Sequence, residues 1–213
     1  MENMKEKISL AATNDADLTS SEIPSIDLYL DQIVSLIADK NSSASECYRD
    51  RNLTKMMVNN YAKGGLIDPP NGKKYSKNHI IQMLLVNRLK SSLSMSEIKQ
   101  LLDGIKREET NVIDLHDSFL SKKESLRESA ASMIDSILDS GDSADAVFTL
   151  LTLSEYFKCA AKLVINESFP VAEEEKPEKA DKSEKKEKPD KADKAEKSEK
   201  KENKKESKKK GEA

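Results

Sequence analysis

The sequence predicts a mainly helical protein with a short basic hairpin in its first domain and a long charged tail at its end. Apolar residues recur at helical spacing in six segments between residues 24 and 167. One Asn-Gly pair between short apolar flanks indicates a two-residue hairpin turn. The tail, 173–213, consists mostly of Lys, Glu and Asp and its only hydrophobic side chains are Ala, so it has too little apolar area to offset the entropy of ordering.

The composition of the body of the chain, 1–172, excludes several classes of protein. A body of this length can bury a hydrophobic core without disulfides. Its two cysteines, Cys47 and Cys159, lie far apart in the sequence and outside any paired motif, which is typical of a reduced intracellular protein. The N-terminus has no signal peptide pattern. The most apolar stretch, 146–165, carries three charged side chains, so we expect neither a membrane span nor membrane binding and infer a cytoplasmic location.

The N-terminal part predicts an arm followed by a helix. Residues 1–22 are polar and without periodicity, which is typical of a flexible arm. Pro24 suits the first turn of a helix, and apolar residues follow at helical spacing. We therefore expect a helix over 24–39.

The next segment predicts a short helix and a hairpin. Thr54 is suited to cap a helix, and Gly64-Gly65 is suited to end it, which places a helix at 54–63. Asn71-Gly72 then indicates the hairpin turn. The preceding Pro69-Pro70 argues against a long central strand, so the hairpin lies at an edge.

The second half of the chain predicts four more helices. A helix begins at Ser76, and the capping box 94–97 begins a shorter one that ends at Gly104. Two longer helices follow at 112–139 and 143–167. The last is apolar nearly all round, so it needs the preceding helix or a second subunit for burial.

These elements divide the chain into four parts. We expect a flexible arm, a helical domain with the hairpin, a helical dimerisation or partner-binding region and a disordered Lys/Glu-rich tail, at 1–22, 23–106, 107–169 and 170–213.

Basic charge is concentrated in one segment. Residues 49–90 contain nine Lys or Arg against two Asp, a net charge of +7, whereas the rest of the body is −12 and the tail, 173–213, is +2. The overall pI of about 5.7 hides this segment. A local excess of positive charge is the electrostatic footprint of nucleic-acid binding.

A short helix followed by a basic hairpin and further helices is the layout of a winged helix-turn-helix domain. Such a helix fits the DNA major groove, about 12 Å wide, and a hairpin beside it reaches the backbone. Helix 54–63 offers side chains suited to base edges or phosphate, namely Lys55, Asn59, Asn60 and Lys63. The hairpin adds phosphate-binding groups, namely Lys73, Lys74 and Tyr75. Tyr61 fits either the core or a backbone contact.

Two families share motifs with this segment. Residues 61–70, 74–76 and 94–102 resemble the MerR-type motifs Tyr-x-x-x-Gly-Leu-Leu-x-Pro-Pro, Arg-Tyr-Ser and Ser-Leu-x-Glu-Ile-x-x-Leu-Leu. A closer resemblance is to the bacterial family named domain of unknown function 1836. Its patterns Leu-Thr-Lys-x-Met-x-Asn-Asn-Tyr, Lys-Lys-Tyr-Ser-x-x-His-Ile and Leu-Lys-x-x-Leu-Ser-x-Ser-x-Ile-Lys are similar to 53–61, 73–80 and 89–99. Together the similar segments cover roughly 24–104.

The MerR-type resemblance implies a promoter-binding fold, double-stranded DNA as partner and a homodimer formed through residues after 110. It implies backbone contacts for Tyr61 and Tyr75 and places Lys74 where a wing Arg is usual. The usual Arg two residues before the helix tyrosine is Asn59 here, which removes a charged phosphate contact. No cysteine cluster or aromatic effector domain follows, so we predict no effector, metal or cofactor.

Nothing in the sequence has the pattern of a catalytic site. His79 and His116 have no partner His, Cys or carboxylate at metal-binding spacing, and no phosphate loop or nucleophile elbow occurs. We therefore expect a non-enzymatic DNA-binding protein, a transcriptional regulator. The missing Arg and the acidic remainder leave one alternative, a protein-interaction adaptor that keeps the winged fold without specific DNA binding.

Overall fold

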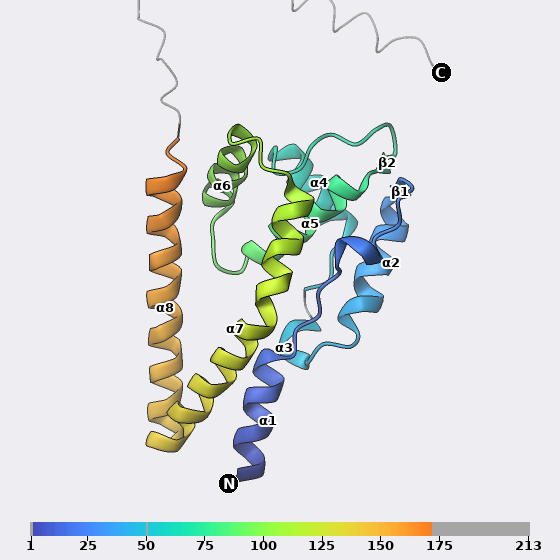
Figure 1. Ribbon diagram of the computed structural model, residues 1–213. Coiled ribbons are helices and arrows are strands. Elements are labelled where there is room, and N and C mark those ends of the chain that lie inside the picture. The colour runs from blue at the N-terminus through green and yellow to red at the C-terminus, as the bar shows by residue number, and fades with distance from the viewer. Residues whose placement is uncertain (1, 50, 172–213) are drawn as a thin grey trace, which may run out of the picture. The chain divides into compact units, whose positions relative to one another are not determined.

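The computed structural model describes residues 2–49 and 51–171. As the sequence predicts, this part of the chain is mainly helical, and its two short strands form one antiparallel sheet (Figure 1). The elements in chain order are α1 (Glu2–Thr13), η1 (Ser20–Glu22), β1 (Leu28–Tyr29), α2 (Leu30–Asn41), α3 (Glu46–Arg49), α4 (Lys55–Lys63), β2 (Lys74–Tyr75), α5 (Lys77–Leu89), α6 (Met95–Arg107), α7 (Val112–Ser140) and α8 (Ser143–Ser168).

The hydrophobic core lies among α2, α4, α5 and α6. Each of these helices contributes aliphatic side chains that are completely buried, namely Ile33, Val58, Ile80, Ile81, Val86 and Ile98. Leu28 of β1 and Tyr75 of β2 are Cα partners in the sheet, and both belong to the same core. The sheet therefore ties the hairpin to the segment that precedes α2.

The N-terminal segment differs from the flexible arm predicted for 1–22. Residues 2–13 form helix α1, which runs beside α7 (Figure 1). The Tyr48 hydroxyl donates to the carbonyl of Ala12, and Lys5 pairs with Asp139 of α7. Because these partners are remote in sequence, the polar composition of residues 1–22 could not predict the contacts.

The helix predicted over 24–39 is wrong at its start. Leu28 and Tyr29 form β1, and α2 begins only at Leu30. The backbone of both residues is used in pairing with β2, which removes them from the helix. Gln32 then accepts the backbone N–H of Tyr29 at 2.9 Å and caps the start of α2.

Helix α6 continues to Arg107, beyond the end predicted at Gly104. Gly104 is a buried position inside the helix, and a Cβ there would lie 2.7 Å from Cβ and Cγ of Phe169. Real Cβ atoms essentially never come so close to other atoms. The glycine therefore serves close packing between α6 and the end of α8.

Polar contacts reinforce this junction between α6 and α8. Lys162 pairs with Glu97 at 3.0 Å, and the Gln100 amide donates to the carbonyl of Phe169 at 2.9 Å. Arg107 donates to the carbonyl of Pro170 at the same distance. The C-terminal end of α8 is thus held on α6 at several points.

Glu97 makes the α6–α8 junction sensitive to acid. Its pKa is lowered from 4.5 to about 2, first by the backbone N–H of Ser94, then by Lys162 and the Ser94 hydroxyl. Because the folded-state pKa is depressed, the stabilisation is complete above pH 4.5 and is lost as the pH falls toward 2. We expect the hydrogen-exchange protection factors of residues 162–169, taken relative to the intrinsic exchange rate at each pH, to fall over this range in the native protein.

A Glu97→Gln variant should show lower protection factors in residues 162–169 already at neutral pH, with little further change in these factors in acid. Glu128→Gln, at an exposed position on α7, is the matched control and should behave like the native protein. Equal acid sensitivity in the Glu97→Gln variant would contradict the role of this carboxylate.

The two long C-terminal helices are present as predicted, and they form a helical hairpin. Helices α7 and α8 closely match the predicted ranges 112–139 and 143–167, and Gly141 separates them. Asn111 accepts the N–H of Ile113 and Asp142 that of Asp145, so each helix has a side-chain cap. The predicted tail, 170–213, lies outside the described residues except for Pro170 and Val171.

Candidate nucleic-acid interface

Helix α4 is fixed at both ends by its own sequence. The Thr54 hydroxyl accepts the N–H of Met57 at 3.2 Å, as expected for the N-cap. Gly65 at the C-terminal end has a φ of 65°, which glycine adopts without steric cost. The start and end predicted for this helix are therefore confirmed.

One side of α4 packs into the core and the other faces outward. Val58 and Tyr61 are 0% and 2% exposed. The polar residues predicted as DNA contacts on this helix, Lys55, Asn59, Asn60 and Lys63, are all exposed. Three of them recur at four-residue spacing along one face of the helix, and Met56 beside them is 73% exposed.

The basic hairpin has its turn one position later than predicted. Asn71 and Lys74 exchange backbone hydrogen bonds of 3.1 and 3.2 Å, so Gly72 and Lys73 are the central residues. Gly72 has a φ of 65°, which suits the first central position of a two-residue hairpin turn. Both Lys73 and Lys74 are exposed.

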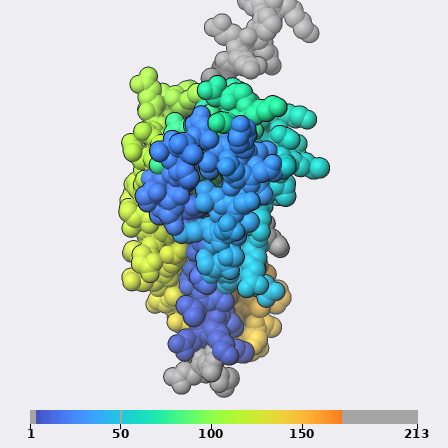
Figure 2. Space-filling model, turned by 90° about the vertical axis from the view of Figure 1, so that its right-hand side faces the viewer, coloured from blue at the N-terminus to red at the C-terminus, as the bar shows by residue number. Residues whose placement is uncertain are grey.

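Beyond the turn, the hairpin pairs with β1. Tyr29 is the Cα partner of Lys74, and the ammonium group of Lys74 lies 5.2 Å from the centre of the Tyr29 ring. A cation at this distance from an aromatic face is attracted to it. Both views place α4 and the hairpin at the same end of the molecule (Figures 1 and 2).

Two predicted DNA contacts are core residues instead. Tyr61 is 2% exposed, its hydroxyl has no hydrogen-bond partner among the described residues, and burial raises its pKa. Tyr75 is 7% exposed and packs edge-on against His79 with 5.9 Å between ring centres. Their large apolar rings pack inside the domain, where they fix α4 and β2 rather than contact a partner directly.

His79 and Asp68 hold the loop before the hairpin, a role that the sequence did not reveal. The Nδ1 atom of His79 accepts the backbone N–H of Ser76 at 3.1 Å, and its Nε2 donates to the carbonyl of Pro69 at the same distance. Asp68 accepts 2.8 and 2.9 Å hydrogen bonds from Gln82 and Lys106, which lower its pKa in that order. These contacts anchor the loop to α5 and α6.

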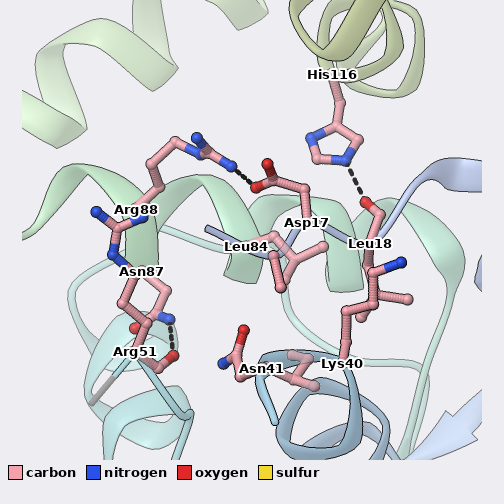
Figure 3. Close-up of a pocket in the computed structure, with 11 residues that line it drawn as sticks. Asp17, Leu18, Lys40, Asn41, Arg51, Leu84, Asn87, Arg88 and His116 are labelled. Carbon is pink, nitrogen blue, oxygen red and sulfur yellow. Dashed lines mark hydrogen bonds and ion pairs between the residues drawn. The ribbon is translucent and has the colours of Figure 1, made fainter. Parts of the chain in front are cut away.

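Some of the basic side chains of residues 49–90 are paired with carboxylates of the same protein. Arg88 pairs with Asp17 (Figure 3). Arg51 lies 3.7 Å from Asp15. Both carboxylates also pair with Lys123 of α7, whose side chain is only 10% exposed. Asp15 and Asp17, which follow α1, therefore neutralise Arg51 and Arg88. From the sequence, both arginines had been counted as part of a basic surface.

A small cavity adjoins this cluster of charges. It measures about 40 Å³ and is lined by Asp17, Arg51, Asn87, Arg88 and His116 among others (Figure 3). His116 bonds to the carbonyl of Leu18 at 2.8 Å through Nε2. The volume is well below the roughly 300 Å³ at which small-molecule sites begin.

Fewer basic side chains of residues 49–90 are free of acidic partners than the net charge of +7 suggests. Lys55 lies 2.5 Å from Asp31 of α2, with both side chains largely exposed. Lys63, Lys73 and Lys74 have no ion-pair partner among the described residues. These lysines lie on α4 and the turn, where the sequence predicted contacts with DNA.

Residues 2–49 and 51–171 contain neither a metal-binding cluster nor a helix that could cross a membrane. No group of three or more His, Cys, Asp or Glu in this part of the chain is placed to hold a metal ion. None of its helices combines the length and apolar character needed to cross a bilayer.

Comparison with known proteins identifies a domain but not an activity. Residues 18–121 match the model of a family described as Domain of unknown function (DUF1836). The match includes β1, both sides of the basic hairpin, α4 and the start of α7. It supports the resemblance to domain of unknown function 1836 that the motifs between residues 24 and 104 indicated, and it does not extend to the MerR-type resemblance. Searches of curated proteins and of solved structures gave no significant match.

Proposed function

We propose that this protein is a cytoplasmic transcriptional regulator that binds double-stranded DNA through a winged helix-turn-helix domain. Helix α4 would enter the major groove, and the turn at Gly72-Lys73 would contact the adjacent backbone. The observation that carries the proposal is the exposed polar face of α4, formed by Lys55, Asn59 and Lys63 at four-residue spacing. The mechanism is occupancy of a promoter without catalysis.

The side chains on this face suit the chemistry of DNA. The amides of Asn59 and Asn60 can pair with the edge of adenine, and Lys63 can reach guanine or phosphate. Lys73 and Lys74 supply point charges for phosphate, which position the domain without reading sequence. Tyr61 and Tyr75 support the site from inside by fixing α4 and β2.

The charge distribution favours one orientation on DNA. The body outside residues 49–90 carries −12, so the phosphate backbone repels most of its surface. Helix α4 and the turn, which carry these exposed lysines, lie at the same end of the molecule (Figures 1 and 2). Approach through this end therefore minimises repulsion and brings the amides to the base edges.

The proposal is tested by selecting genomic DNA fragments on the purified full chain and measuring affinity for the selected sequence. We expect Asn59→Ala and Asn60→Ala each to lose about 1–3 kcal/mol for that sequence, because each removes base contacts. Their affinity for random DNA should stay close to that of the native protein. Fluorescence anisotropy at fixed salt gives both numbers.

Asn166→Ala is the matched control, since Asn166 is an exposed amide on α8, outside the proposed DNA-binding face of α4 and the turn. It should leave both affinities unchanged. Native protein that binds selected and random DNA equally well would rule out sequence-specific regulation through α4.

The alternative adaptor function is favoured by the use of basic residues inside the protein. Arg51 and Arg88 are held by acidic partners, and Lys55 is paired with Asp31. Fewer cations are then free for phosphate than the net charge of residues 49–90 indicates. Recovery of one protein partner in a pull-down, with no DNA retained at moderate salt, would support the adaptor.

A further inference from the structure

Helices α7 and α8 diverge from their connection (Figure 1), and a groove lies between them. The groove measures about 490 Å³ and is also bounded by the end of α5 and the residues that follow it. Ala146 near the start of α8 and Ile165 near its end are only 3% and 5% exposed. The groove therefore lies beside the middle of a helix whose two ends are packed, and Phe157 in this middle part is 60% exposed.

The lining of this groove is largely apolar and contains a single charged side chain. The apolar residues come from all three sides of the groove and include Leu89, Leu93, Met133, Ile134, Leu153 and Phe157. The polar residues are Ser92, Ser154 and Lys158. A mostly apolar lining with a few polar groups that fix orientation is typical of a small-molecule site.

Lys158 is the charged residue of the groove. It is exposed and has no ion-pair partner in the described part of the chain. Ser154 lies four residues earlier on α8, so its hydroxyl and the ammonium group share one face of the helix. Lys162, one turn further on, differs because it pairs with Glu97 at 3.0 Å. A free cation beside a hydroxyl, next to an apolar surface, complements an apolar molecule with an anionic head group.

The size of the groove favours a narrow ligand over a protein helix. An α-helix is about 10 Å wide and rises about 1.5 Å per residue, so two turns of it occupy about 800 Å³. The groove, at about 490 Å³, holds less than this. Small-molecule sites span about 300–1,000 Å³, a range that includes the groove.

Two further occupants suit the groove less well than a small molecule. The tail, 173–213, is dominated by Lys, Glu and Asp, and its only hydrophobic side chains are Ala, so it has nothing to bury against an apolar lining. A lipid bilayer presents a broad surface, whereas the apolar lining lies between helices. A single apolar chain can enter such a groove.

We propose that the groove binds a long-chain fatty acid, with the carboxylate at Lys158 and the acyl chain along the apolar lining. A carboxylic acid is ionised at neutral pH and pairs with an ammonium group. The Ser154 hydroxyl can donate to the second carboxylate oxygen. The sequence predicted no effector, because the lining residues of α5, α7 and α8 come together only in the fold. The site does not depend on DNA binding, and its test uses no DNA.

Calorimetric titration of the full chain with decanoate tests the proposal. We expect saturable binding of one molecule per chain with a dissociation constant of about 10–100 μM. From octanoate to dodecanoate, each added CH₂ should tighten binding about twofold, because an open groove buries about half of the chain's surface. No saturable binding up to about 1 mM would overturn the proposal and leave the groove to a partner helix.

Lys158→Gln tests the contact with the head group. It should weaken decanoate binding about 10-fold, because it removes a charge-assisted hydrogen bond. Decanol, which has the same chain without the charge, should bind the native protein and this variant equally well. Lys7→Gln is the matched control, since Lys7 is exposed on α1 outside the lining. Equal weakening of decanoate binding by the two variants would overturn the proposal.

Ala161→Phe tests the apolar part of the site without changing a charge. Ala161 lines the groove and is exposed, so a larger side chain fills the groove and leaves the core intact. We expect it to weaken decanoate and decanol binding alike by at least about 10-fold, with an unchanged circular dichroism spectrum. Ala144→Phe, at an exposed position of α8 outside the lining, should bind both ligands like the native protein. Undiminished binding to Ala161→Phe would overturn the proposal.

Discussion

Replacing Lys73 and Lys74 by Glu is expected to weaken DNA binding about 100-fold, for selected and random sequences alike. Both lysines are exposed on the hairpin turn, and the proposed function gives each a charge-assisted contact with phosphate. Such a hydrogen bond contributes about 1.5 kcal/mol, so losing two accounts for the expected factor. Phosphate contacts carry no sequence information, so the ratio of specific to random affinity should be preserved.

The corresponding Ala variant isolates the electrostatic part of this effect. Each phosphate contact contributes about 0.9 to the slope of log affinity against log salt. Lys73→Ala with Lys74→Ala should therefore make the slope shallower by about 2. Titrations at several salt concentrations measure it.

A double charge reversal elsewhere controls for net charge. Lys7 and Lys122 are exposed on α1 and α7, and changing both to Glu alters the total charge by the same amount. We expect a much smaller loss of affinity from this variant. Equal losses from the two double variants would show that net charge, rather than contact by the hairpin, governs binding.

Asp17→Asn is expected to lower the free energy of unfolding by about 3 kcal/mol. Removing one partner of a buried ion pair leaves the other charge without compensation, which costs about 3–5 kcal/mol. Asp17 pairs with both Arg88 and Lys123, and the side chains of Asp17 and Lys123 are only 12% and 10% exposed. Asp15 still pairs with Lys123, so the lower end of this range applies. Urea unfolding followed by circular dichroism measures the loss.

An exposed pair provides the comparison for this loss. Asp103 and Lys99 lie 2.9 Å apart on α6, each about half exposed. Asp103→Asn should cost less than about 1 kcal/mol because solvent screens the pair. If Asp17→Asn cost no more than Asp103→Asn, the cluster would not stabilise the fold in the way its burial indicates.

The elements that the sequence predicted well are those with local causes. Thr54 and Gly65 fix the ends of α4 through contacts with near neighbours in the chain, and the same holds for the caps of α7 and α8. The pairing of β1 with β2 was missed because the two strands are far apart in the sequence, one before α4 and the other after it. Helix α1 was missed because its partners lie on α7 and on α3, far away in the sequence.

In the candidate site, too, features with local causes could be predicted and features that depend on distant contacts could not. Exposure of Lys55, Asn59 and Lys63 follows from helical periodicity, so the sequence was sufficient to predict that face. Tyr61 could be placed on either side of the helix by its chemistry, and only the packing of α4 against its neighbours decides for the core. Net charge along the chain could not distinguish surface lysines from Arg88, whose partner Asp17 lies on a distant segment.

The position of Asp15 and Asp17 has a practical consequence for dissecting this protein. The segment that matches the family model, 18–121, begins just after these acids and ends just before Lys123. A protein cut at those boundaries would keep Arg51 and Arg88 but lose both carboxylates that neutralise them. The shortest fragment that folds on its own should therefore begin before Asp15, so the evolutionary unit and the folding unit of this chain have different ends.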